Sequence, residues 1–127
     1  MQNLTREDAM AAVALTSVWT DGYLDPEEDG ALVEALLDTQ AWPDERTLRT
    51  TLVRLDSLAR QHGDAALRAA ACQRLRGADA LATLQLAASL VTSDATLETA
   101  ERDYLSKLGQ ELGLTEQTVM QALEGNA

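Results

Sequence analysis

The chain has 127 residues, which corresponds to one domain with enough buried surface for a core that needs no crosslinks. Hydrophobic residues make up 46% and charged residues 24%, which excludes a wholly disordered chain, and two prolines and seven glycines are too few for a many-stranded β protein. The net charge of −11, from 10 basic and 21 acidic residues, argues against nucleic acid and anionic lipid as partners and favours cations and basic proteins.

In the first part of the chain, apolar residues recur at helical spacing, and capping signals divide them into three predicted helices. The first begins at a capping box of Thr5 and Asp8. The clearest start is Asp25-Pro26, which places an N-cap residue before a proline at the first helical position. The predicted spans are about 5–18, 25–39 and 44–61.

Four more helices are predicted in the rest of the chain, at about 64–75, 79–91, 99–112 and 115–123. Gly63, Gly77 and Gly113 are natural stops between helices. No run alternates as a strand would, so the sequence predicts an all-α fold: a compact bundle of about seven helices in a single domain over residues 1–127. Because aromatic residues make up only 3%, the core must consist mainly of Leu and Ala.

An internal repeat organises the predicted helices. A shift of 73 residues aligns residues 9–40 with residues 82–113. Each copy consists of a helix, a short acidic loop and a second helix, so we predict two pseudo-symmetric helical hairpins related by a twofold axis. The identical pairs are Ala14 and Ala87, Val18 and Val91, Asp21 and Asp94, Leu24 and Leu97, Glu28 and Glu101, and Leu32 and Leu105.

The acidic loop of each repeat carries the oxygen donors that hard cations such as Ca²⁺ and Mg²⁺ prefer. The first loop matches the second half of an EF-hand calcium loop, but two earlier ligand positions of that motif would fall on Ser17 and Trp19. A tryptophan cannot ligate calcium, so a standard EF-hand is excluded. The second loop has Ala95 where the first has Gly22, so its turn must be made differently.

Two interpretations of these acidic residues stay open. Acidic residues before a helix stabilise it by capping and by the helix dipole, typically by ~0.3–1 kcal/mol each, without any ligand. The duplication favours the alternative, because a twofold axis can bring four carboxylates to one place, where they require a cation. The candidate metal ligands are Asp21, Glu28, Asp94 and Glu101, with Asp25 and Glu98 in support.

The paired pattern resembles a known family. It consists of an apolar helix with Asp-Gly-x-Leu-x-Pro-Glu-Glu, a second with Ser-Asp-x-x-Leu-x-x-x-Glu, and a terminal Leu-Gly-Leu-Thr helix. This pattern, from about Thr5 to Leu123, resembles the TerB-like domain of tellurite-resistance proteins and the N-terminal part of DjlA-type membrane co-chaperones. The resemblance implies a two-hairpin helical fold without known catalysis. It also implies an acidic metal site on Asp21, Glu28, Asp94 and Glu101.

Catalytic motifs are absent from the sequence. His62 is the only histidine, and Cys72, which lies among alanines, is typical of a packed side chain. We therefore expect no enzyme and no catalytic residues, but a TerB-like domain that binds a divalent cation in a tellurite, metal or general stress response. The alternative is a metal-independent scaffold for another protein, and a carboxylate-based hydrolase is a third reading.

The distribution of charge and the residues at the start of the chain indicate the expected partners and location. Residues 46–76 hold seven basic and two acidic residues, which form either a basic face or bridges to neighbouring carboxylates. Arg6 is offset by Glu7 and Asp8 ahead of an apolar run, unlike an export signal, and no run is long enough to cross a membrane. We expect a cytoplasmic protein with a basic or membrane-associated protein partner, no nucleic acid and no membrane insertion.

Overall fold

The computed structural model of the chain describes residues 4–18, 30–91 and 99–125. Within these ranges the chain is helical and has no strand, which confirms the predicted all-α fold. The helices are α1 (Arg6–Val18), α2 (Gly30–Asp38), α3 (Glu45–His62), α4 (Asp64–Cys72), α5 (Ala78–Val91), α6 (Thr99–Glu111) and α7 (Glu116–Gly125).

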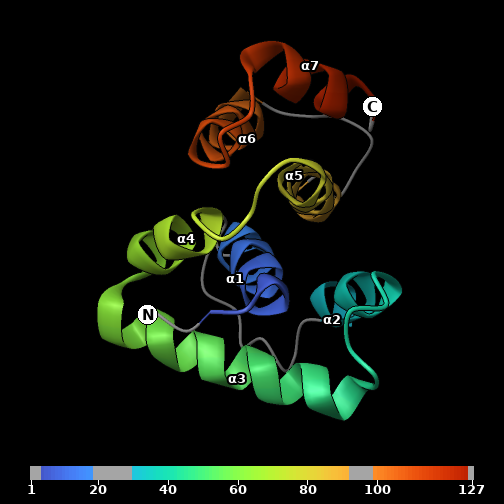
Figure 1. Ribbon diagram of the computed structural model, residues 1–127, viewed down its shortest axis with the longest axis vertical. Coiled ribbons are helices and arrows are strands. Elements are labelled where there is room, and N and C mark those ends of the chain that lie inside the picture. The colour runs from blue at the N-terminus through green and yellow to red at the C-terminus, as the bar shows by residue number, and fades with distance from the viewer. Residues whose placement is uncertain (1–3, 19–29, 92–98, 126–127) are drawn as a thin grey trace.

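Helix α1 lies in the middle of the bundle (Figure 1). It packs against α2, α3, α4 and α5, and α5 separates it from α7. Helices α6 and α7 pack on α5 and on each other. The bundle is therefore built around the neighbouring pair α1 and α5, which are the first helices of the two predicted repeats.

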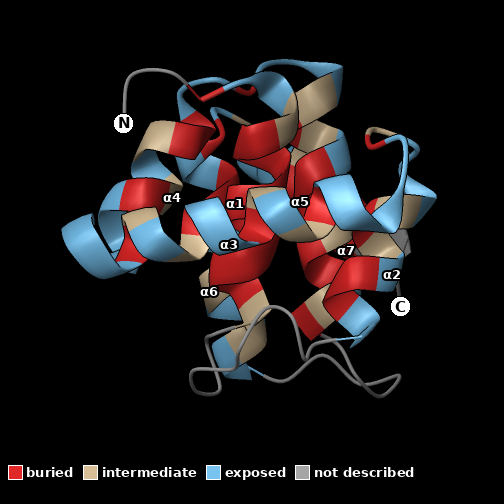
Figure 2. Ribbon diagram, turned by 90° about the horizontal axis from the view of Figure 1, so that it is seen from below, coloured by how far each residue is buried: buried red, intermediate tan, exposed pale blue. Residues whose placement is uncertain are grey.

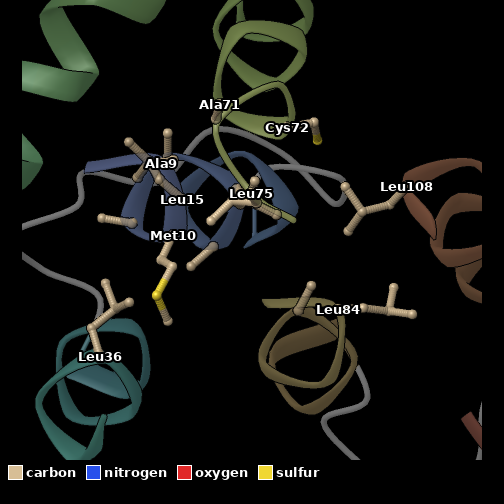
Figure 3. Packing of buried hydrophobic residues seen from close by; sticks show 14 of the residues in the cluster. Ala9, Met10, Leu15, Leu36, Ala71, Cys72, Leu75, Leu84 and Leu108 are labelled. Atoms are coloured by element: carbon tan, nitrogen blue, oxygen red, sulfur yellow. The ribbon is translucent and has the colours of Figure 1, made fainter. Parts of the chain in front are cut away.

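The core consists mainly of Leu and Ala, as predicted from the low aromatic content. Buried faces of the helices point to the interior in Figure 2, and Figure 3 shows Leu36 and Leu108 directed toward the space around α1. Alanines occupy much of α1, including Ala9, which is fully buried. Small side chains let neighbouring helices approach closely, so a seven-helix core fits within the described part of this short chain.

Several predicted helix ends are confirmed by their capping geometry. Thr5 and Asp8 form the reciprocal capping box, with N···O distances of 3.0 and 3.1 Å. The Asp44 carboxylate accepts from the Thr47 N–H at 2.7 Å, and this bond lowers the pKa of Asp44. Gly63 follows α3 with φ 94°, a conformation that residues with a side chain rarely adopt.

The fourth helix differs from its prediction. It ends at Cys72 rather than near residue 75, because the next two residues turn more tightly. The N–H groups of Arg74 and Leu75 donate to carbonyls three residues back, at 3.0 and 3.2 Å, instead of continuing the α-helical ladder. Asp64 is the first residue of this helix and does not cap it, and its carboxylate accepts from the adjacent Ala65 N–H at 3.0 Å.

The ends of two helices follow the register of the predicted repeat. Helices α2 and α6 end at Asp38 and Glu111, which are 73 residues apart. The predicted start of the second helix at Asp25 lies outside the described residues.

Candidate functional site

The structure describes one of the six predicted metal ligands. Glu101 lies in the first turn of α6 and is half-buried. The other five lie outside the described residues: Asp21, Asp25, Glu28, Asp94 and Glu98. The geometry of the candidate site is therefore given by the helices that flank the two acidic segments, residues 19–29 and 92–98.

Helices α1 and α5, which precede the two acidic segments, run in the same direction. The guanidinium of Arg6 and the carboxylate of Asp79 lie 2.9 Å apart, which joins the start of α1 to the start of α5. A 13-residue helix such as α1 is roughly 20 Å long, so this ion pair excludes an antiparallel arrangement of two helices that lie side by side (Figure 1). Val18 and Val91, the last described residues before the two acidic segments, consequently lie on the same side of the bundle.

A partly buried pair of hydroxyl groups joins α1 to α6. The Ser17 Oγ and the Tyr104 hydroxyl oxygen are 2.8 Å apart. Ser17 is fully buried and donates its only hydroxyl hydrogen to the Val13 carbonyl at 2.7 Å. Tyr104 must therefore be the donor to Ser17.

The position of Tyr104 brings Glu101 toward the same region. The two residues are three positions apart on α6, so they share one face of the helix. Because Tyr104 contacts Ser17, this face of α6 is turned toward the last turn of α1. Ser17 precedes Asp21 by four residues. Glu101 belongs to the second predicted repeat, and the Ser17–Tyr104 contact joins its helix, α6, to α1 of the first predicted repeat.

The surroundings of Tyr104 keep its hydroxyl protonated and its ring in place. Burial raises the pKa of Tyr104, against smaller opposing effects of the Ser17 hydrogen bond and the Arg68 charge. The guanidinium of Arg68 lies 5.7 Å from the ring centroid and also pairs with Glu111 at 3.4 Å. Polar contacts at Tyr104 and at Arg68 therefore join helices α1, α4 and α6.

Sequence reasoning did not identify Ser17 and Tyr104 as a pair. They are 87 residues apart, and the repeat gives no hint because their equivalents, Leu90 and Ala31, are apolar. The available signal was a lone aromatic residue, since no other Phe, Trp or Tyr follows Trp42. A serine near the end of the apolar run of α1 was the second signal.

The nitrogen and sulfur groups of the chain offer no metal site in the described part. Burial raises the pKa of the Cys72 thiol to about 12, which keeps it protonated and unsuited to ligation or nucleophilic attack. His62 is the last residue of α3 and is exposed. Across residues 4–18, 30–91 and 99–123, no three His, Cys, Asp or Glu side chains lie close enough together to hold a metal ion.

Most arginines of the basic middle segment are held by neighbouring groups. Arg74 donates to the Leu4 carbonyl at 2.8 Å, which ties the start of the described chain to the turn after α4. Of the two alternatives for these side chains, the structure therefore favours bridges to neighbouring groups, and an open basic face is not what it shows for them. The ion pairs are Arg49 with Glu45, Arg54 with Asp8, Arg60 with Asp56, and Arg68 with Glu111.

A hollow of about 400 Å³ lies on the first half of α3. Val53, at its edge, is 47% exposed. None of the six predicted metal ligands is among the described residues that line it, which are Glu45, Arg46, Arg49, Thr50 and Val53.

Comparison of the chain with protein-family models, with curated proteins and with solved structures found no match. Among the described helices, none combines the length and the apolar composition needed to cross a membrane.

Proposed function

We propose that the chain is a TerB-like domain without catalytic activity, which binds a divalent cation through its two acidic segments. The observation that carries this proposal is the Ser17–Tyr104 hydroxyl pair. It joins α1, which leads into the first segment, to α6, which follows the second. Together with the common direction of α1 and α5, it supports a shared location for carboxylates of both repeats.

The charge of the two segments supports a cation as the ligand. Residues 19–29 contain five carboxylates and residues 92–98 contain two, with no Lys, Arg or His in either. Like charges held near one another repel, and a divalent cation relieves this repulsion by binding several carboxylates at once.

The donor chemistry favours Ca²⁺ or Mg²⁺ over Zn²⁺. All candidate ligands are oxygen donors, whereas the buried thiol of Cys72 belongs to α4 and His62 belongs to the end of α3. As a cation-binding module the domain would serve a tellurite, metal or general stress response in the cytoplasm. A basic or membrane-associated protein would be its partner.

Calorimetric titration of the purified chain with Ca²⁺, Mg²⁺, Mn²⁺ and Zn²⁺ tests the proposal. We expect Ca²⁺ or Mg²⁺ to bind with a dissociation constant below about 1 mM, within the range of protein calcium sites. Glu101→Gln should weaken this binding at least about tenfold, because a neutral amide replaces a charged ligand of similar shape.

Glu116→Gln is the matched control. Glu116 is also an acidic residue in the first turn of a helix, α7, but it lies outside the acidic segments. If neither Ca²⁺ nor Mg²⁺ binds, or if the two variants lose affinity equally, the acidic residues act as helix caps. The metal-independent scaffold then becomes the better description.

A further inference from the structure

Helices α6 and α7 are attached to the bundle differently from the helices before them. Their extensive contacts are with α5 and with each other, whereas α1 is packed by four helices. In Figure 1 the two helices lie together at one end of the molecule. The core that α1 forms with α2, α3, α4 and α5 would therefore keep its own contacts if α6 and α7 moved away.

Arg68 and Tyr104 join α6 to α1 and α4. The Arg68 guanidinium lies 5.7 Å from the centroid of the Tyr104 ring and forms an ion pair with Glu111 at 3.4 Å. The Tyr104 hydroxyl in turn bonds Ser17 at 2.8 Å. The side chains of Arg68 and Glu111 are 20% and 34% exposed, so water competes for the ion pair and its contribution is modest. No helix has to unfold for these contacts to break.

The single cysteine of the chain lies beneath α6. Cys72, the last residue of α4, is 1% exposed and belongs to the same buried cluster as Leu108 of α6. Figure 3 shows the two side chains on the facing sides of α4 and α6. Burial raises the pKa of the Cys72 thiol to about 12, and the nearby Glu111 of α6 contributes to this rise. A reagent reaches this thiol only after its cover has moved, so its modification reports that movement.

We propose that α6 and α7 open from the bundle as one unit, held closed by the contacts of Arg68 and Tyr104, while α1 to α5 stay folded. Contiguous parts of a protein can open in this way with a free energy below that of global unfolding. Opening uncovers the side of α5 on which the two helices pack, together with Leu105 and Leu108, which are buried in the closed bundle. The open state thus presents an apolar surface that the closed domain lacks. This inference does not depend on cation binding.

Alkylation of Cys72 by iodoacetamide tests the proposal on the full chain. The reagent is uncharged, and at about pH 8 an uncovered thiol is partly ionised and reactive. The chemical step is slow compared with reclosing, so the alkylation rate reports the population of the open state. We expect this rate to rise with urea, but with a smaller slope than global unfolding measured by circular dichroism. The reason is that opening exposes only part of the surface that global unfolding exposes.

Two variants weaken the closed state from different helices. Arg68→Met and Tyr104→Phe should each raise the alkylation rate about fivefold, because each loses a contact of the closed state and keeps a side chain of similar size near the thiol. Arg54→Met is the matched control, since the ion pair of Arg54 with Asp8 joins α3 to α1 and persists when α6 and α7 open. It should leave the rate unchanged within about twofold, although it lowers the free energy of global unfolding.

Three results would overturn the proposal. If alkylation has the same urea slope as global unfolding, and Arg54→Met raises the rate as much as Arg68→Met, Cys72 is reached only through global unfolding. If the rate does not depend on urea, a local movement around the thiol is enough and α6 and α7 do not open. If neither Arg68→Met nor Tyr104→Phe raises the rate, their contacts do not hold the two helices closed.

Discussion

Helices α1 and α5 hold equivalent places in the predicted repeat, but the bundle buries them to different extents. In α1 every residue from Asp8 to Ser17 is buried, whereas α5 buries one face and exposes the other. The pairs at a separation of 73 residues show this directly. Ala9 and Ala82 are the same residue type, yet the first is fully buried and the second is exposed.

The neighbours of the two helices explain the difference. Helices α3 and α4, which lie between the repeats in the chain, both pack on α1 and cover the side that an isolated hairpin would leave to solvent. The polar residues of α1 are adapted to this burial. The hydroxyl of Thr16 bonds the Ala12 carbonyl at 3.0 Å, and the carboxylate of Asp8 pairs with Arg54 at 2.5 Å. The burial of α1 is therefore accompanied by partners for its polar side chains inside the bundle.

The same substitution in both helices gives the largest expected contrast. Ala9→Glu should lower the free energy of unfolding by more than about 3 kcal/mol or prevent folding, because it places a charge in a filled interior. Ala82→Glu should change it by less than about 0.5 kcal/mol. Urea unfolding followed by circular dichroism measures both. Equal losses would show that α1 is not covered on its outer side.

A second contrast concerns the second helix of each repeat. Leu36 of α2 is fully buried, and its equivalent in α6 is Gly109, where α7 packs instead. A Cβ atom at residue 109 would lie 2.3 Å from a methyl carbon of Val119. Gly109→Ala should therefore destabilise the protein by roughly 1–3 kcal/mol, despite the better helix propensity of alanine.

Val119→Ala in the Gly109→Ala chain provides the control, because it removes the methyl group that is too close. In urea unfolding, the double variant should lose less free energy of unfolding than the sum of the losses in the two single variants. Additive effects would mean that α7 does not approach α6 at Gly109.

The helices could be predicted because their signals are local. Capping at Thr5 and Asp44 is decided within four residues, and Gly63 and Gly113 have the positive φ angles that favour glycine after a helix. The end of α4 was less predictable, because no glycine or proline marks it at Cys72.

Packing between distant segments could not be predicted in the same way. The continuous apolar run of α1 indicated burial, but nothing in it showed that α3 and α4 would cover the helix. The Ser17–Tyr104 bond joins residues of different repeats whose equivalents do not share their chemistry. Of the candidate ligands, Glu101 can be placed on the fold, and the role of all six stays a prediction.

The ion pair between Asp8 and Arg54 tests a smaller difference between the repeats. Asp8 corresponds to Leu81 of α5, and its side chain is only 9% exposed. Arg54→Met should lower the free energy of unfolding by about 1 kcal/mol, since half of the arginine is in solvent and the Thr5 N–H still bonds the carboxylate.

Arg60→Met is the matched control on the same helix, because Arg60 bonds Asp56 one turn away at 3.1 Å. A pair one turn apart within a single helix contributes about 0.3–0.5 kcal/mol, so this loss should be the smaller one in urea unfolding. If both variants lose the same free energy of unfolding, the ion pair between α3 and α1 contributes no more stability than an ion pair within α3.

The smallest expected effect is the pH dependence of the Asp44 cap, which stabilises the start of α3 and thus the outer cover of α1. The Thr47 N–H lowers the pKa of Asp44 below its ordinary value of 3.8. The charged cap therefore stabilises the folded state above pH 3.8, and this contribution is lost as the pH falls through the lower pKa of the folded state.

Asp44→Asn keeps an acceptor oxygen but has no charge to titrate. The stability of the unmodified chain relative to Asp44→Asn should thus decrease as the pH falls below 3.8, as measured by urea unfolding across that range. A constant difference would show that the cap acts through the hydrogen bond alone, and that α3 covers α1 without help from this charge.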